Sequence, residues 1–188
     1  MASEPKRIWH GDIERGACLS DCERYRYTLW RRWGDEPKPE KSPCMVFVML
    51  NPSTADGQYD DPTIRRCMGF ADSFGYHAML VVNLFAFRAT NPRDLWSEED
   101  PIGPENDEAI RRACYPTTHR VVAAWGSPKH AWHDRRAQEV TRLLATRLHT
   151  LATTKHGHPR HPLYLAADAS LSPWSGPFSL RKEATNGE

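Results

Sequence analysis

Apolar residues in this chain gather in three runs, separated by segments with helical spacing. Residues 45–50, Met-Val-Phe-Val-Met-Leu, contain no polar position, which is typical of a strand buried on both faces of a sheet. Residues 77–87 and 120–125 contain similar runs. Three further segments place apolar side chains on one helical face: residues 64–71, 105–114 and 134–151.

The order of these elements predicts an α/β fold. Strands that alternate with helices favour a parallel sheet, and right-handed crossovers place helices on both of its faces. We therefore expect a three-layer α/β/α domain with a central, mainly parallel sheet. We place it at residues 18–165, after a polar N-terminal arm (1–17) and before a C-terminal tail (166–188) without periodicity. Residues 18–33 have a mixed helical pattern with interleaved arginines, and we expect a helix there.

Charge and composition narrow the possible partners. The 188 residues carry 25 Lys+Arg and 24 Asp+Glu, so the formal net charge of +1 indicates neither a nucleic-acid nor a membrane partner by itself. No apolar run approaches the roughly 18 residues of a membrane span, and the polar start has no signal-peptide core. Five irregularly spaced cysteines favour reduced thiols. We expect a cytoplasmic monomer with no membrane partner, no cofactor and no metal site.

Polar residues follow the first predicted strand directly. Asn51-Pro52 ends this strand because proline cannot donate to the ladder, and Ser53, Thr54 and Asp56 then supply side-chain oxygens. In an open α/β sheet, ligands bind just outside the carboxyl ends of the strands. The segment from Asn51 to Asp61 is therefore predicted to lie at the mouth of a site.

Two further residues near the same edge carry candidate chemistry. Asn83 lies at the end of the second predicted strand, where its amide can offer a donor and an acceptor to a nucleobase edge or hold a neighbouring loop. Asp61 can act as a carboxylate base or cap the following helix. The sequence leaves both alternatives open for each residue.

Several of these motifs resemble a family of unknown function, numbered 1643, over residues 22–165. The segments that carry the resemblance are Tyr25-Arg26-Tyr27, Leu50-Asn51-Pro52-Ser53-Thr54-Ala55-Asp56, Asp61-Pro62-Thr63, Asn83-Leu84-Phe85, Pro101-Ile102-Gly103-Pro104-Glu105-Asn106-Asp107, Ala124-Trp125-Gly126 and His161-Pro162-Leu163-Tyr164. This family name implies no activity.

A more distant resemblance implies one. The Leu-Asn-Pro-Ser turn is similar to the first motif of the uracil-DNA glycosylase superfamily, and three later segments match in order and approximate spacing. These are Val82-Asn83-Leu84 followed by Arg88-Ala89-Thr90, then Trp125-Gly126, and then His161-Pro162. In place of the superfamily's glycine after the proline, this chain has Ser53. The resemblance implies a uracil-DNA glycosylase-like fold and hydrolysis of the N-glycosidic bond of uracil or a modified base in DNA.

The same resemblance implies roles for individual residues. Asn51 would hold the attacking water, Asn83 the base edge, and His161 would donate a hydrogen bond to the departing base. Leu163 would fill the gap that a flipped base leaves. The other candidate substrate contacts are Pro52, Ser53, Thr54, Asp56, Phe85, Arg88, Trp125, Gly126 and Arg160. With Asn51 and His161, Asp61 completes the candidate catalytic set.

Two other functions fit the sequence. One is a small-molecule enzyme that processes a nucleoside or nucleotide, which a modest pocket with an acidic rim would favour. The other is a non-catalytic nucleic-acid-binding module built on Tyr25-Arg26-Tyr27 and Arg31-Arg32. A basic groove without a buried polar cluster would favour the module.

Overall fold

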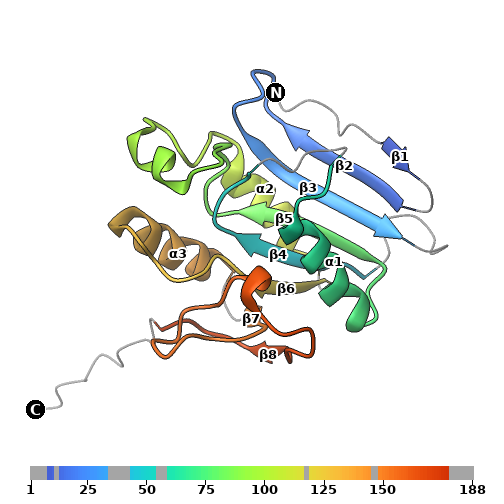
Figure 1. Cartoon of the computed structure of the whole chain (residues 1–188). Coiled ribbons are helices and arrows are strands. Elements are labelled where there is room, and N and C mark those ends of the chain that lie inside the picture. The colour runs from blue at the N-terminus through green and yellow to red at the C-terminus, as the bar shows by residue number, and fades with distance from the viewer. Residues whose placement is uncertain are drawn as a thin grey trace, which may run out of the picture.

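The sheet is mixed. A computed structural model describes residues 8–10, 13–33, 43–53, 59–116, 119–144 and 148–177, and these contain one eight-stranded sheet of order β1-β2-β3-β5-β4-β6-β7-β8 (Figure 1). The strands are β1 (Ile8–His10), β2 (Ile13–Leu19), β3 (Arg26–Trp33), β4 (Met45–Met49), β5 (Ala78–Asn83), β6 (Arg120–Ala123), β7 (Leu148–Thr150) and β8 (Ser172–Pro173).

The predicted α/β class is confirmed, but the expected mainly parallel sheet is wrong. The neighbours β5, β4, β6 and β7 are parallel, whereas β1, β2, β3 and β8 pair antiparallel with their neighbours. The reason lies in the connection between β2 and β3, which is too short for a crossover and therefore forms a hairpin.

Helices cover both faces of the sheet. Helix α1 (Pro62–Ser73) packs against Met45, Phe47 and Met49 of β4, and α2 (Asn106–Cys114) and α3 (Ala131–Leu144) pack on the opposite face with Val46 and Val48. Every residue of β4 is buried because its alternating side chains enter the two clusters in turn. The uninterrupted apolar run at 45–50 thus corresponds to a central strand.

Two helical predictions are wrong. Residues 18–33 form the end of β2, a turn and β3. The pattern at 134–151 belongs to α3, which ends at Leu144, and to the short strand β7. Arg31 explains the first error, because this residue of β3 is fully buried and pairs with Asp60 (Nε–Oδ1 2.6 Å), so its charge does not mark a solvated face.

Part of the segment predicted as a C-terminal tail (166–188) belongs to the sheet. Strand β8 pairs with β7, and Trp174 packs against Trp125 at a ring-centroid distance of 5.3 Å. At the other end, β1 and most of β2 lie within residues 1–17. None of the helices in the described part is long and apolar enough to cross a membrane.

Candidate functional site

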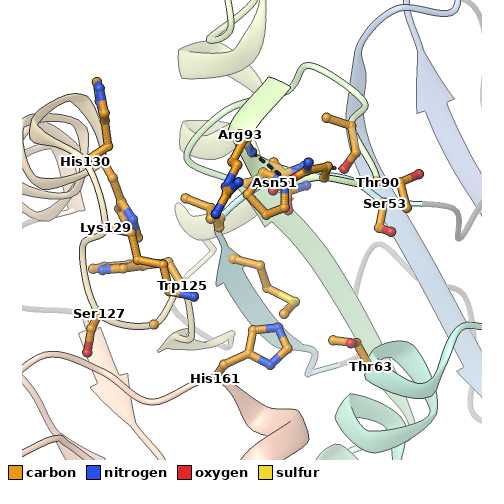
Figure 2. A pocket seen from close by; sticks show the side chains of 18 of the residues that line it. Asn51, Ser53, Thr63, Thr90, Arg93, Trp125, Ser127, Lys129, His130 and His161 are labelled. Atoms are coloured by element: carbon orange, nitrogen blue, oxygen red, sulfur yellow. Dashed lines mark hydrogen bonds between the residues drawn. The ribbon is translucent and has the colours of Figure 1, made fainter. Parts of the chain in front are cut away.

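A cavity of about 1040 Å³ lies at the carboxyl ends of β4, β5 and β6. It is bordered by the first turns of α1 and α3, by the 3₁₀ helix η1 (Pro92–Ser97) and by the 3₁₀ helix η3 (Pro162–Tyr164). In Figure 2, Asn51, Ser53 and Thr90 lie on one side, Lys129 and His130 on the other, and His161 and Thr63 below. The cavity occupies the place that the strand pattern predicts for a ligand.

The Asn51 amide fastens the turn at the end of β4. Its Nδ2 donates to the carbonyl oxygens of Pro52 (2.9 Å) and Ala89 (2.8 Å), and the Ala89 N–H donates to the Pro52 carbonyl (3.0 Å). These bonds join the turn to the segment after β5. Because both Nδ2 hydrogens are used, Oδ1 is the side-chain atom that remains for a ligand or a water molecule.

The Asn83 side chain is buried in the wall of the cavity. Its side chain lines the cavity and is 1 % exposed, yet neither Nδ2 nor Oδ1 is hydrogen-bonded to any of the described residues. Its main chain, in contrast, is held firmly, because Asn106 Nδ2 donates to the carbonyl oxygens of Asn83 (3.0 Å) and Leu84 (3.1 Å). The fold therefore fixes this amide at the cavity wall and leaves its polar atoms unused.

His161 and Asp61 face the cavity from η3 and α1. The Leu163 N–H donates to His161 Nδ1 (3.3 Å), so in the neutral ring the hydrogen is on Nε2. Burial lowers the pKa of His161, which the Asp61 carboxylate partly opposes, and this favours the neutral ring. Asp61 caps α1 by accepting from the Ile64 N–H (2.8 Å) through Oδ1, so Oδ2 is not needed for the cap.

Aromatic rings form one wall of the cavity. The rings of Trp96 and His130 are stacked at a centroid distance of 4.5 Å, and Phe85 supports Trp96 edge-on at 5.6 Å. Trp125, 3 % exposed, contributes a second ring. Such surfaces suit a planar ligand because offset or edge contacts with an aromatic ring are favourable.

The charges around the cavity are mainly positive. The described lining includes four cationic side chains and one carboxylate, that of Asp61: the cations are Arg26, Arg93, Lys129 and Arg160. Arg93, Lys129 and Arg160 are exposed, so they lie within reach of an anionic ligand at the rim. Buried Arg26 lies deeper in the lining, on β3.

A family model described as "Protein of unknown function (DUF1643)" matches residues 26–163. The chain belongs to the DUF1643 family. The matched range contains every residue that lines the cavity except Tyr164. No curated protein and no solved structure matches the chain, so its resemblance to the uracil-DNA glycosylase superfamily stays a prediction.

The cavity of this DUF1643 protein brings together many of the residues singled out from its sequence. Those that line it are Asn51, Ser53, Asp61, Asn83, Trp125, Gly126, Arg160 and His161. At Gly126 the backbone is left-handed (φ 83°), which favours glycine, and His161 Cβ lies 4.0 Å from the position that a Cβ atom would occupy.

Other predicted residues of this DUF1643 chain lie elsewhere. Pro52 is buried in the turn, and Phe85 belongs to the core behind Trp96. Arg88 lines a smaller neighbouring cavity of about 420 Å³, which shares Ser53 with the main one. Leu163 is 39 % exposed and does not line the main cavity. Thr54 and Asp56 fall outside the described residues.

Sequence reasoning missed the part of the DUF1643 cavity that α3 and η1 provide. The main residues are Arg93, Trp96, Lys129, His130 and His133. The predicted helix started at Asp134, whereas α3 starts at Ala131 and brings its first turn to the cavity. The available signal was Gly126-Ser127-Pro128, a turn directly after a strand, which indicates that the next residues begin a helix at the same sheet edge.

Proposed function

We propose that this protein hydrolyses the N-glycosidic bond of uracil or a modified base in DNA, with a three-layer fold like that of the uracil-DNA glycosylases. The observation that carries the proposal is Asn83, a buried amide that lines the cavity and has neither polar atom hydrogen-bonded to a described residue. Buried polar groups normally have partners, and a nucleobase edge offers a donor beside an acceptor. A base bound in the cavity supplies the missing bonds.

The charge distribution supports a phosphate-bearing ligand. Arg93, Lys129 and Arg160 surround the mouth, where they can contact the phosphates on either side of an extruded nucleotide. The stacked Trp96–His130 pair offers a surface for the base. Leu163 is exposed and only two residues from His161, so it can fill the gap that the extruded base leaves in the DNA stack. We propose a monomer, because one chain supplies all of these groups.

In the proposed reaction, a water molecule held by Asn51 Oδ1 attacks C1′ of the sugar. The C1′–N bond breaks and its electron pair leaves with the base, to which His161 Nε2–H donates a hydrogen bond as negative charge develops. Such donors contribute about 3 kcal/mol in comparable sites. The water passes its proton to Asp61 Oδ2, and the departing base takes a proton from solvent.

A second candidate is an enzyme that processes free nucleotides, since a cavity of about 1040 Å³ also accommodates a mononucleotide. Its rim is basic, however, whereas an acidic rim would favour such an enzyme. The non-catalytic module has less support. Of the five residues on which it would depend, Arg26, Tyr27 and Arg31 are at most 3 % exposed in β3. Tyr25 and Arg32 are only partly exposed.

The test is abasic-site formation on labelled oligonucleotides, single- and double-stranded, that carry uracil, hypoxanthine or hydroxymethylated bases. We expect cleavage of at least one substrate by the wild type and none by Asn83→Leu. Gln138→Leu is the matched control, because it removes an amide of α3 that does not line the cavity. If no oligonucleotide is cleaved but a free nucleotide is hydrolysed, the second candidate replaces the glycosylase.

A further inference from the structure

A second buried group in the same cavity has no hydrogen-bond partner in the described part of the chain. His133 is 1 % exposed, lines the cavity, and has neither Nδ1 nor Nε2 hydrogen-bonded to any described residue. Neither the strand-end pattern nor the resemblance to the glycosylases assigns it a role. A buried imidazole with two unsatisfied nitrogens requires an explanation in the same way as Asn83 does.

The contacts of α3 hold the helix face that carries His133 against the residue that follows Asn83. Arg136 Nε donates to the Leu84 carbonyl oxygen (2.9 Å), and Arg136 also pairs with Asp107 at the start of α2. The bond to Leu84 holds the second turn of α3 against the residue that follows β5. Because His133 precedes Arg136 by three residues, both lie on the same helix face, and Leu84 directly follows Asn83.

His133 is suited to hydrogen bonding without charge. Burial lowers its pKa to about 4, with Asp134 opposing and His158 and Lys129 adding to the shift, so the ring is neutral at pH 7. A neutral imidazole offers one donor and one acceptor. These two atoms can therefore bond a polar atom of a ligand in the cavity that the Asn83 amide also lines.

We propose that His133 and Asn83 together recognise a heterocycle with at least three polar atoms along one side. Two of these atoms pair with the Asn83 amide and the third with the His133 ring. A base that lacks the third atom leaves His133 unpaired and binds more weakly, so His133 acts as a specificity-determining residue. The inference rests on base recognition in the proposed function but does not require hydrolysis.

The test measures the affinity of five probes by isothermal titration calorimetry: the 5′-monophosphates of uridine, cytidine, adenosine, guanosine and inosine. We expect at least one probe to bind the wild type and to bind His133→Phe at least tenfold more weakly. His133→Gln, which restores a donor and an acceptor, should recover part of the loss. In the double variant Asn83→Leu/His133→Phe, the two losses should not be additive, because both residues contact one ring.

A second measurement separates a binding role from a folding role. We expect the His133→Phe protein without ligand to melt at the wild-type temperature or above, because the phenyl ring fills the same space without unpaired polar atoms. Binding of every probe to His133→Phe at wild-type strength, or of none to the wild type at millimolar concentration, would overturn the inference. Probe binding without abasic-site formation would leave this recognition role standing and refute the glycosylase.

Discussion

Two buried asparagines have opposite roles in this protein. Asn106 uses its Nδ2 to hold the carbonyl oxygens of Asn83 and Leu84, whereas the Asn83 amide is unpaired among the described residues. A buried polar group without a partner costs about 1–3 kcal/mol. We therefore expect Asn83→Leu to raise the free energy of unfolding by about 1 kcal/mol, and Asn106→Leu to lower it by about 2 kcal/mol. Urea denaturation of both variants measures the two changes.

The pair also provides its own control. Both substitutions replace an asparagine with leucine at a site that is at most 1 % exposed, so the difference between them reports on hydrogen bonding. A loss of stability in Asn83→Leu equal to that in Asn106→Leu would show that the Asn83 amide has a structural partner, and would remove the main support for base recognition.

His133 predicts a specific dependence of stability on pH. Its pKa is about 4 in the folded protein, because of burial, and near 6.5 in the unfolded chain, so between these values only the unfolded chain binds the proton. Stability should fall as the pH drops from 6.5 toward 4. In urea denaturation at pH 7 and pH 4.5, we expect the wild type to lose about 2–3 kcal/mol more than His133→Phe.

The comparison with the variant isolates His133 from other titrating groups. The pKa of His161 is lowered as well, and its contribution has the same sign, but it is present in both proteins and cancels in the difference. An equal loss of stability in the wild type and His133→Phe would mean that the folded His133 ring accepts a proton as readily as the unfolded one.

At the level of single residues, position along a strand was the useful signal in the sequence. The place of Asn83 at the cavity could be predicted because it ends a buried apolar run at the carboxyl edge of the sheet. His133 could not, since a histidine near a helix start looks the same whether it faces solvent or a cavity. Its burial depends on the long-range bond from Arg136 to Leu84.

The turn after β4 combines a structural role with a proposed chemical role in one side chain, that of Asn51. Asn51 Nδ2 donates to two carbonyl oxygens, of Pro52 and Ala89. We expect Asn51→Ala to lower the free energy of unfolding by about 1–2 kcal/mol. Asn51→Asp should be less stable than Asn51→Ala at pH 7, because a carboxylate would then face both carbonyl oxygens. Thermal and urea unfolding of the two variants would measure the order.

The opposite order of stability would contradict the assignment of Nδ2 toward the carbonyl oxygens. In that case the Asn51 amide would present its nitrogen to the cavity, and the proposed contact between Oδ1 and the attacking water would be wrong.

Elements were predictable where burial and periodicity agree. β4, α1 and α2 follow their patterns closely, and Asp61 caps α1 as its position suggests. β3 was misread because arginine and aromatic residues are interleaved along it. In the structure Arg26 and Arg31 are both buried, and Arg31 pairs with Asp60 from a distant loop. Local sequence carries no information about such a partner, so tertiary pairing overrides the apparent helical pattern.

Across the whole molecule, the net charge of +1 conceals an uneven distribution. Many cations are paired, such as Arg15 and Arg31 with Asp60, and Arg112 with Glu108. At the rim of the cavity, in contrast, three exposed cations have no ion pair with a described residue: Arg93, Lys129 and Arg160. A nucleic acid bound there should release counterions, although the chain as a whole is almost neutral.

Salt dependence measures this local field directly. For a labelled single-stranded oligonucleotide, each neutralised phosphate contributes about −0.7 to the slope of log K against log salt concentration. Three contacts predict a slope of about −2, which Lys129→Gln and Arg160→Gln should each reduce by about 0.7. Arg112→Gln is the matched control, because this exposed cation lies on α2 outside the cavity lining and should leave the slope unchanged. Binding is measured by fluorescence anisotropy at salt concentrations from about 50 to about 200 mM, a range over which phosphate contacts change the affinity strongly. A wild-type slope near zero would show that these cations do not contact phosphates, and would favour a ligand without a nucleic-acid backbone.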